Sequence, residues 1–447
     1  MQNKILYSKA SPFRMLLAGY LFFILAGMIL LSLPAATKAE APASLVDIFF
    51  TTVSAVTTSG LVVLETPEYF SVFGQMVILV LIQICGLGYM IFVSFIILAI
   101  GRKITMGNMM LLKENVTSPT YGDAFYFMKI AVIFTVIFEV VAAAVFFTVF
   151  RAEYSGLEAA YHAVFQAVSA FCTAGFTTLP DNFKVFADNS GLLFFGALIS
   201  ISGGIGFFVL FDLYSFAKER IKGKKTVHLT VHSKFVIALT LIVTVMGTLL
   251  LFVDGFRVLD MSYNRLVQAF FHTVMAMTTT GFNSVDITAV SDSGKTILMM
   301  LMFIGAAPGG TASGIKVVTV GILFMTFLSV ITKKNSVNVF EREISSGEIK
   351  RAVSIVFSGV MFIMITTYAV TALETKVFMD VLFDSVAAYT NGGLSVGAAG
   401  KTSDGGKIIM SLAMLMGRMG SLAIGFSLLG RVKKESVKFP DAGIIIG

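Results

Sequence analysis

The sequence contains no tryptophan, two cysteines, four histidines and few charged residues. Of its 447 residues, 13% are charged and 56% are hydrophobic, whereas a soluble domain carries about 25% charged residues. The chain therefore lacks the polar surface that a soluble fold needs. Without tryptophan, any aromatic belt at a membrane interface must be formed by tyrosine.

The scarce cysteines and histidines exclude further classes. Cys85 and Cys172 lie in or beside apolar runs, which argues against a disulfide framework. The histidines show no metal-ligand spacing with them, so we expect no structural metal site and no cofactor bound by this chain. The net charge of +7 resides mainly in short connectors between apolar runs. That pattern is typical of a membrane orientation signal and does not predict a nucleic-acid partner.

Long apolar runs are what the sequence has instead. Most of them exceed the roughly 18 residues that mark a membrane-spanning helix. The first run is too long for the core of a signal peptide, so we keep it as a permanent helix. The sequence thus predicts an all-α polytopic membrane protein with eight spans. These cover residues 13–34, 70–100, 127–150, 191–217, 235–253, 295–331, 352–373 and 405–430.

Basic residues divide unequally between the two sides of these spans. The connectors on one side carry 21 Lys or Arg, and those on the other side carry nine. The richer side is cytoplasmic by the positive-inside rule, so we expect both termini inside the cytoplasmic membrane. The connectors on the richer side are residues 1–14, 101–126, 218–234, 332–351 and 431–447.

A motif that ends in glycine recurs in the four outer connectors. Its glycines are 115, 106 and 112 residues apart, and each is followed by Leu or Phe. A turn between spans would not require the same neighbours four times. We therefore predict four helix–pore loop–helix repeats in a pseudo-fourfold arrangement around one pore. The four motifs are Thr57-Thr58-Ser59-Gly60, Cys172-Thr173-Ala174-Gly175, Thr278-Thr279-Thr280-Gly281 and Thr390-Asn391-Gly392-Gly393.

The motifs divide the chain into four repeats. The repeats cover residues 13–100, 127–217, 235–331 and 352–430, and residues 431–447 form a cytoplasmic tail.

The chemistry of potassium explains why these residue types occur in each motif. A dehydrated potassium ion exchanges its water shell for a ring of backbone carbonyl oxygens. Glycine lets the backbone turn those oxygens inward in an extended or left-handed form. We expect potassium at the carbonyls of Gly60, Gly175, Gly281 and Gly393. The small polar residues before them, such as Thr173, are expected to hydrogen-bond behind the loop.

A second glycine feature lies 24 to 28 residues after each motif glycine, within the even-numbered spans. In the first two repeats, at Gly86 and Gly203, close helix packing explains it. In the third repeat, small residues interrupt the apolar run, so the helix should break and form a gate. This predicted gate comprises Gly305, Ala306, Ala307, Pro308, Gly309, Gly310, Thr311, Ala312, Ser313 and Gly314, with Lys316 closing the stretch.

In the fourth repeat the second feature contains Arg418, a charge placed at membrane depth. Such a charge should face water or a partner. We expect it to act on the cation path as an electrostatic barrier or as a latch on the gate. The alternative is a structural ion pair with Glu139.

Taken together, these features resemble the Trk/Ktr/HKT superfamily of potassium transporters, and most closely the membrane subunits of its bacterial Ktr branch. The resemblance covers nearly the whole chain. It places the family's filter glycines at the four motif glycines, its intramembrane gating loop at residues 305–314 and its pore-facing arginine at Arg418. In the family, Ser at the first filter position accompanies sodium permeation, so Gly60 implies potassium selectivity.

The resemblance also implies partners. Ktr membrane subunits are homodimers with one pore in each chain, and they dock on a cytoplasmic ring of nucleotide-binding regulatory subunits. Residues 218–234 and 332–351 are the expected docking surface, although they could instead serve as orientation signal and lipid-headgroup contact. Sodium is a possible activator.

Two other functions fit the sequence less well. The stretch Gly309–Lys316 superficially resembles a phosphate-binding loop, but its Lys does not follow the second glycine and no Ser or Thr follows the Lys. We therefore do not expect an enzyme. A carrier that couples potassium to sodium or protons more often shows inverted repeats, so it stays the alternative to a pore.

Overall fold

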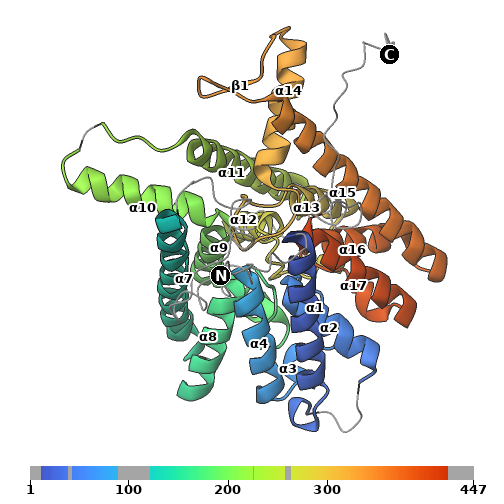
Figure 1. Cartoon of the computed structure of the whole chain (residues 1–447). Coiled ribbons are helices and arrows are strands. Elements are labelled where there is room, and N and C mark those ends of the chain that lie inside the picture. The colour runs from blue at the N-terminus through green and yellow to red at the C-terminus, as the bar shows by residue number, and fades with distance from the viewer. Residues whose placement is uncertain (1–11, 39–42, 89–120, 225, 257–262, 421–447) are drawn as a thin grey trace, which may run out of the picture.

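The structure is a computed structural model that describes all residues except 1–11, 39–42, 89–120, 225, 257–262 and 421–447. The described part is a bundle of helices with one small antiparallel ribbon of β1 (Asn338–Val339) and β2 (Arg342–Glu343) (Figure 1). The predicted all-helical class is therefore confirmed. The predicted tail and residues 101–120 of the inner connector 101–126 lie outside the described residues.

One order of elements occurs four times along the chain: a long helix, a shorter helix, an extended segment and another helix. The long helices are α1 (Pro12–Leu31), α7 (Tyr121–Phe150), α11 (Val231–Leu250) and α15 (Ser346–Leu373). The shorter helices are α2 (Leu45–Thr57), α8 (Gly156–Phe171), α12 (Tyr263–Met277) and α16 (Phe378–Thr390). The helices after the extended segments are α4 (Val72–Gly86), α9 (Ser190–Gly204), α13 (Asp292–Ile304) and α17 (Asp404–Met419).

The remaining elements connect these or extend them. The helices are α3 (Thr66–Tyr69), α10 (Phe207–Ile221) and α14 (Val317–Ile331), and a π-helical turn, η3 (Leu251–Gly255), extends α11. The 3₁₀ turns are η1 (Pro34–Ala36), η2 (Asn182–Phe186), η4 (Ile287–Ala289) and η5 (Ala399–Lys401).

The four groups of helices pack in a closed order. Helix α4 packs against α8, α9 against α12, and α13 against α16, so each group contacts the shorter helix of the next. Helix α17 then packs against α2, which brings the end of the chain back to its beginning. The shorter helices therefore lie inside, and their residues are largely buried.

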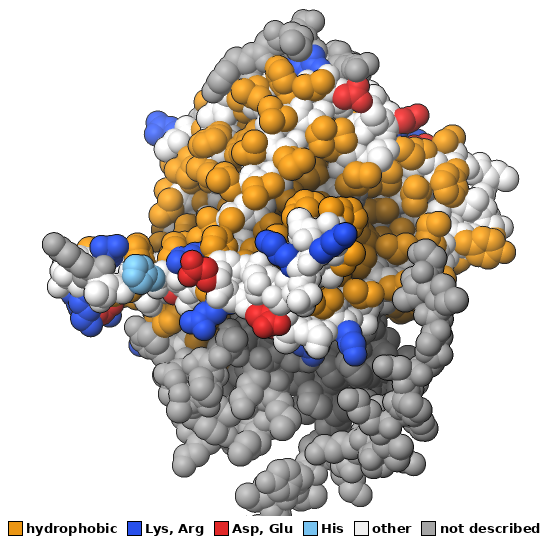
Figure 2. Space-filling view, turned by 90° about the horizontal axis from the view of Figure 1, so that it is seen from above, with side chains coloured by type: hydrophobic (Ala, Val, Ile, Leu, Met, Phe, Trp, Pro, Cys, Tyr) orange, Lys and Arg blue, Asp and Glu red, His pale blue; other side chains and the backbone are white. Residues whose placement is uncertain are grey.

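Three described helices are long and apolar enough to cross a membrane: Phe127–Phe150, Val231–Gly255 and Ser346–Leu373. Between 22% and 28% of their apolar windows is buried, so most of their surface faces outward. Figure 2, which views the molecule from above, shows hydrophobic side chains spread widely over the exposed surface. Apolar side chains exposed to this extent are stable only against lipid or another apolar surface.

The expected even-numbered spans are not single straight helices. Helices α9 and α10 form a pair bent by 97° rather than one span over 191–217. Gly206 joins them at φ 95°, a conformation that a residue with a side chain rarely adopts. Helix α4 ends at Gly86 and α17 ends at Met419. The remainders of the predicted spans, 89–100 and 421–430, lie outside the described residues.

The glycines of the first two groups mark both a helix end and a close contact. A methyl group built on Gly86 would lie 2.8 Å from Cys172 Cβ. One built on Gly203 would overlap the carbonyl oxygen of Phe171. The packing prediction was therefore right about the contact, but it missed that both helices end there.

Gly203→Ala tests this close approach. The added methyl has no room beside the Phe171 carbonyl, and overpacking of this kind costs about 1–3 kcal/mol of unfolding free energy. We expect a lower thermal unfolding midpoint in detergent. The matched control is Gly191→Ala in the same helix, where the nearest atom to the new methyl is Asn189 Oδ1 at 3.6 Å. Equal midpoints for the two variants would contradict the close-packing interpretation.

Candidate functional site

A residue in the left-handed conformation follows each of the four shorter helices, one or two residues after the helix ends. Thr58, Thr173, Thr279 and Asn391 have φ between 50° and 54°. Two residues later, Gly60, Gly175, Gly281 and Gly393 have φ between 69° and 85°. For threonine, whose side chain is branched at Cβ, this conformation is a genuine outlier. The expected left-handed backbone is thus present at every motif, and it is held there by the surrounding packing.

The structure brings the four motif glycines together. A methyl group built on Gly60 would lie 2.6 Å from the carbonyl oxygen of Ala174. One built on Gly175 would meet the Thr280 oxygen, and one built on Gly281 would lie 2.9 Å from the Gly392 oxygen. One built on Gly393 would lie 2.8 Å from the Ser59 oxygen, which closes the circle. We call these glycines and the residues before them the glycine ring.

Each contact in the ring follows one rule. The carbonyl that precedes one motif glycine lies against the motif glycine of the preceding group of helices. A side chain at any of the four glycines would occupy the space of a neighbouring backbone oxygen. Glycine is therefore required four times for the same steric reason.

The peptide groups of the ring direct their N–H groups back into the short helices. Ser59 N donates to Ser54 O at 2.8 Å, and Ala174 N donates to Ser169 O at 2.8 Å. Thr280 N and Gly392 N make the equivalent bonds, to Met275 O and Ala387 O. Within the described residues, the oxygens of Ser59, Ala174 and Thr280 accept no hydrogen bond. Buried carbonyls normally have a partner, so these oxygens are available to a cation.

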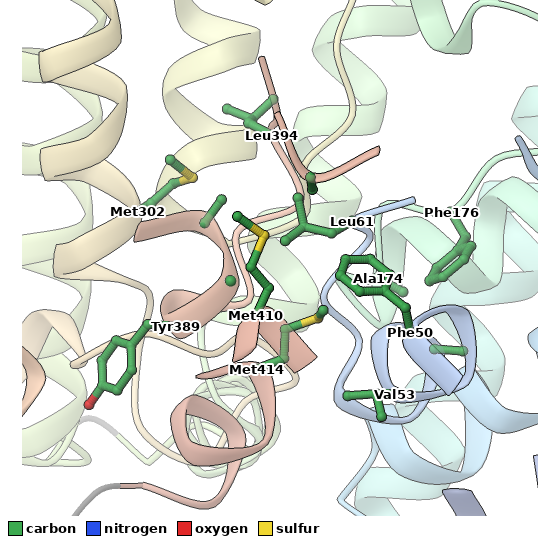
Figure 3. Close-up of a cluster of buried hydrophobic side chains, with 14 of the residues drawn as sticks. Phe50, Val53, Leu61, Ala174, Phe176, Met302, Tyr389, Leu394, Met410 and Met414 are labelled. Carbon is green, nitrogen blue, oxygen red and sulfur yellow. The ribbon is translucent and has the colours of Figure 1, made fainter. Parts of the chain in front are cut away.

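The residue after each ring glycine anchors the extended segment. Leu61, Phe176, Phe282 and Leu394 are at most 1% exposed. Figure 3 shows Leu61, Phe176 and Leu394 among the buried side chains around this region, with Met410 and Met414 of α17 beside them. The recurrence of Leu or Phe at this position in the sequence therefore reflects an apolar anchor.

The expected hydrogen bonds from the polar residues before the glycines are present in two groups of helices. Thr173 Oγ1 donates to Cys172 O and contacts Thr311 Oγ1 at 3.3 Å. Thr279 Oγ1 accepts a bond from Ser313 N at 2.9 Å. In the described part of the chain, the side chains of Thr58 and Asn391 have no hydrogen-bond partner. For these two residues the prediction was wrong.

The helix of the third group breaks as expected, between α13 and α14. Gly305, Gly309, Gly314 and Lys316 all have positive φ, so residues 305–316 form a loop. This loop lies against the ends of the short helices. Thr311 Oγ1 donates to Phe171 O at 2.9 Å, and Thr311 N donates to Gly203 O at 3.1 Å.

Arg418 fastens this loop to α4. One guanidinium nitrogen donates to Thr311 O at 2.7 Å and to Ser313 Oγ at 3.0 Å. The other donates to Cys85 O at 3.0 Å and Gly86 O at 3.2 Å. The ion pair considered with Glu139 is not among the salt bridges of the described residues.

Lys316 turns back onto the loop instead of reaching toward an interface. Its Nζ donates to Ala312 O at 2.6 Å and Ser313 O at 3.2 Å. The loop is therefore held by a cation at its own end and by a second cation from α17.

Sequence reasoning missed a set of polar links between neighbouring groups. Lys407 Nζ lies 2.5 Å from Asp47 Oδ1, which joins α17 to α2, and Lys295 Nζ lies 3.7 Å from Asp380 Oδ1, which joins α13 to α16. Tyr161 donates to Gln75 Oε1 at 2.6 Å between α8 and α4. Asp47 stands 13 residues before Gly60 and Asp380 stands 13 before Gly393, so the equal offsets were a usable signal. The carbonyls of Cys85 and Gly86 carried no such signal, because any residue has one.

Apolar helices gathered around converging backbone oxygens are the arrangement of a membrane protein that handles cations. The sequence profile of the TrkH family, which is described as a cation transport protein family, matches residues 19–439 of this chain. The chain belongs to this family, which confirms the predicted resemblance. It is therefore a multi-pass membrane protein, and cation transport is not an enzyme class.

Several known proteins are similar to this chain over its full length. The Ktr system potassium uptake protein B of Bacillus subtilis is 30% identical, over 99% of this chain and 98% of its own. The potassium/sodium uptake protein NtpJ of Enterococcus hirae is 29% identical, over 100% and 99%. The crystal structure of the potassium transporter TrkH from Vibrio parahaemolyticus shares the fold, with a TM-score of 0.72 at 19% identity. That match covers 96% of this chain and 86% of the other.

Arg418→Gln tests whether Arg418 holds the loop. Hydrogen bonds to charged groups contribute about 1.5–3 kcal/mol each, so their loss should raise loop opening by about tenfold or more. We expect faster amide hydrogen exchange in peptides covering residues 305–316. Peptides of α15 should be unchanged, and Arg151→Gln, at an exposed turn, is the matched control. Unaltered exchange in the loop would rule out the fastening role.

Proposed function

We propose that this chain takes up potassium through a gated, potassium-selective pore. Four pore loops in pseudo-fourfold order would line it, one from each of the repeats 13–100, 127–217, 235–331 and 352–430. The observation that carries the proposal is the glycine ring. Four backbone segments meet there at a point where no side chain fits, and the ring oxygens of three of them, Ser59, Ala174 and Thr280, accept no bond within the described residues.

Backbone oxygens suit potassium for a physical reason. Carbonyl dipoles replace the hydration shell of an ion without a full negative charge that would hold it too tightly. The relatives named potassium uptake proteins support the choice of ion. The short helices also aim their negative C-terminal ends at the ring, which favours a cation there.

The 305–316 loop is the proposed gate. It lies directly against the helix ends that carry Thr173 and Thr279, so an ion leaving the ring must pass it. Arg418 would hold the loop in place and add a positive charge to the path. Both effects oppose the passage of cations while the contacts last.

Coupled transport is the alternative function. One full-length relative is named a potassium/sodium uptake protein, which supports a role for sodium as activator or as second ion. A coupled carrier would require sodium or a proton gradient for every turnover. A pore requires only the membrane potential, which contributes about 2.3 kcal/mol per charge per 100 mV.

The proposed setting is the bacterial cytoplasmic membrane, with both termini inside and a homodimer as the assembly. Residues 218–234 and 332–351 would dock a cytoplasmic ring of nucleotide-binding regulatory subunits. The end of α10 forms a protruding arm with exposed Lys218, Arg220, Lys222 and Lys224 (Figures 1 and 2). Hydrogen bonds from Lys224 and Lys222 lower the pKa of Glu219, so this carboxylate offsets part of the positive charge at neutral pH.

Gly60→Ser is the test of the ring. The new side chain would press on the Ala174 carbonyl and widen or distort the oxygen cage. We expect the potassium-to-sodium uptake ratio of reconstituted protein to fall by about tenfold, equivalent to about 1.4 kcal/mol of discrimination. Gly156→Ser is the control, because no atom lies within 4 Å of a methyl built there. A ratio unchanged by Gly60→Ser would overturn the filter assignment.

Arg418→Gln tests the gate in the same assay. Releasing the loop should raise the potassium flux several-fold, because hydrogen bonds to the charged guanidinium contribute about 1.5–3 kcal/mol each. The potassium-to-sodium ratio should stay at its parent value, since the ring is untouched. A flux that does not rise, or a ratio that falls with it, would separate Arg418 from gating.

A further inference from the structure

A polar side chain stands nine residues before each ring glycine, on the inner short helices. All four are 0% exposed. A polar group removed from water is destabilising unless it has a hydrogen-bond partner. The hydrogen-bond partners of these four side chains are therefore informative. The four residues are Thr51, Gln166, His272 and Asp384.

Three of these side chains bond to the segment that follows the glycine in their own group. Gln166 Nε2 donates to Thr177 Oγ1 at 2.6 Å. Ser284 N donates to His272 Nε2 at 3.4 Å. Asp384 accepts from Ser395 Oγ at 2.9 Å. The acceptors and donors on the segments all lie two or three residues after the ring glycine. Each bond therefore ties the short helix to the chain just beyond its ring glycine.

Asp384 makes the most extensive of these ties. Its Oδ1 accepts from Val396 N at 3.0 Å, and its Oδ2 accepts from Ser395 Oγ and from Ala399 N at 2.7 Å. Two of the three donors are backbone N–H groups, so the carboxyl group fixes the path of the main chain itself.

The same segment is held on its other side by Lys376. Its Nζ donates to Ala398 O at 2.8 Å and to Thr402 Oγ1 at 2.7 Å. By contrast, Thr51 in the first group has no hydrogen-bond partner for its hydroxyl within the described residues. The fourth segment is thus clamped more firmly than the first.

We propose that Asp384 is a positioning residue for ion selection, which fixes the segment Leu394–Ala399 and through it the carbonyl oxygen of Gly393. This inference rests on the proposed function. Asp384 does not touch the ion. It acts by keeping one side of the oxygen cage at the spacing that potassium needs, because a looser cage also accommodates sodium.

Asp384→Asn is the principal test, since it keeps the size of the side chain. One oxygen becomes an NH₂ group that faces a donor, so at least one bond is lost in either amide orientation. We expect the potassium-to-sodium uptake ratio to fall by about fivefold, in line with the loss of one buried hydrogen bond. Ser395→Ala removes one of the three bonds and leaves the carboxyl group, so a fall of about twofold is expected.

Thr367→Val is the matched control. Thr367 is a buried residue of α15 in the same repeat, and its hydroxyl donates to Ile363 O within its own helix. A loss of folded protein lowers the uptake of both ions equally and leaves the ratio unchanged. The ratio therefore separates positioning from a purely structural role, and uptake is expressed per folded transporter.

The outcomes are distinct. A parent-like ratio in both Asp384→Asn and Ser395→Ala, with Gly60→Ser altered, overturns the positioning role and leaves the proposed function standing. A parent-like ratio in Gly60→Ser as well overturns the proposed function itself. If Asp384→Asn yields no folded protein, the ratio of Ser395→Ala decides the question alone.

Discussion

The structure depends on the contact between a backbone oxygen of one group of helices and a motif glycine of its neighbour. This contact occurs four times and closes on itself, from Ala174 against Gly60 to Ser59 against Gly393. A carbonyl beside a Cα with no side chain is an approach that only glycine permits. The elements packed around the ring support these four approaches.

That support has three layers. Behind the ring, N–H groups return to the short helices, and the left-handed residues before the glycines turn the chain. Around it, Leu61, Phe176, Phe282 and Leu394 anchor the segments in apolar packing. Farther out, polar links such as Lys407–Asp47 join neighbouring groups. Strained backbone of this kind persists only when the surroundings over-determine it, and these layers supply that constraint.

The 305–316 loop and Arg418 join the ring to the rest of the chain in a different way. Their bonds run mostly to backbone oxygens at helix ends, on α4, α8 and α9. Helix ends leave carbonyls without partners inside the helix, so the ends of α4, α8 and α9 supply the acceptors that the loop and Arg418 use. The ends of α4 and α9 and the fastening of the loop are therefore one feature of the fold.

The sequence by itself determined the membrane class, the four motif glycines and the break after Ile304, and it singled out Arg418 as a charge within an apolar run. Each of these depends on local composition or on repetition along the chain, which can be counted without coordinates. Only the tertiary structure decided that α9 and α10 bend by 97°, that Arg418 bonds to Cys85 and Gly86, and that Asp384 holds the segment beyond Gly393. Those features depend on backbone groups and on residues far apart in the chain. Every residue has the same backbone carbonyl group. The packing of the chain therefore determines which partner a carbonyl binds, and the amino-acid sequence alone does not reveal it.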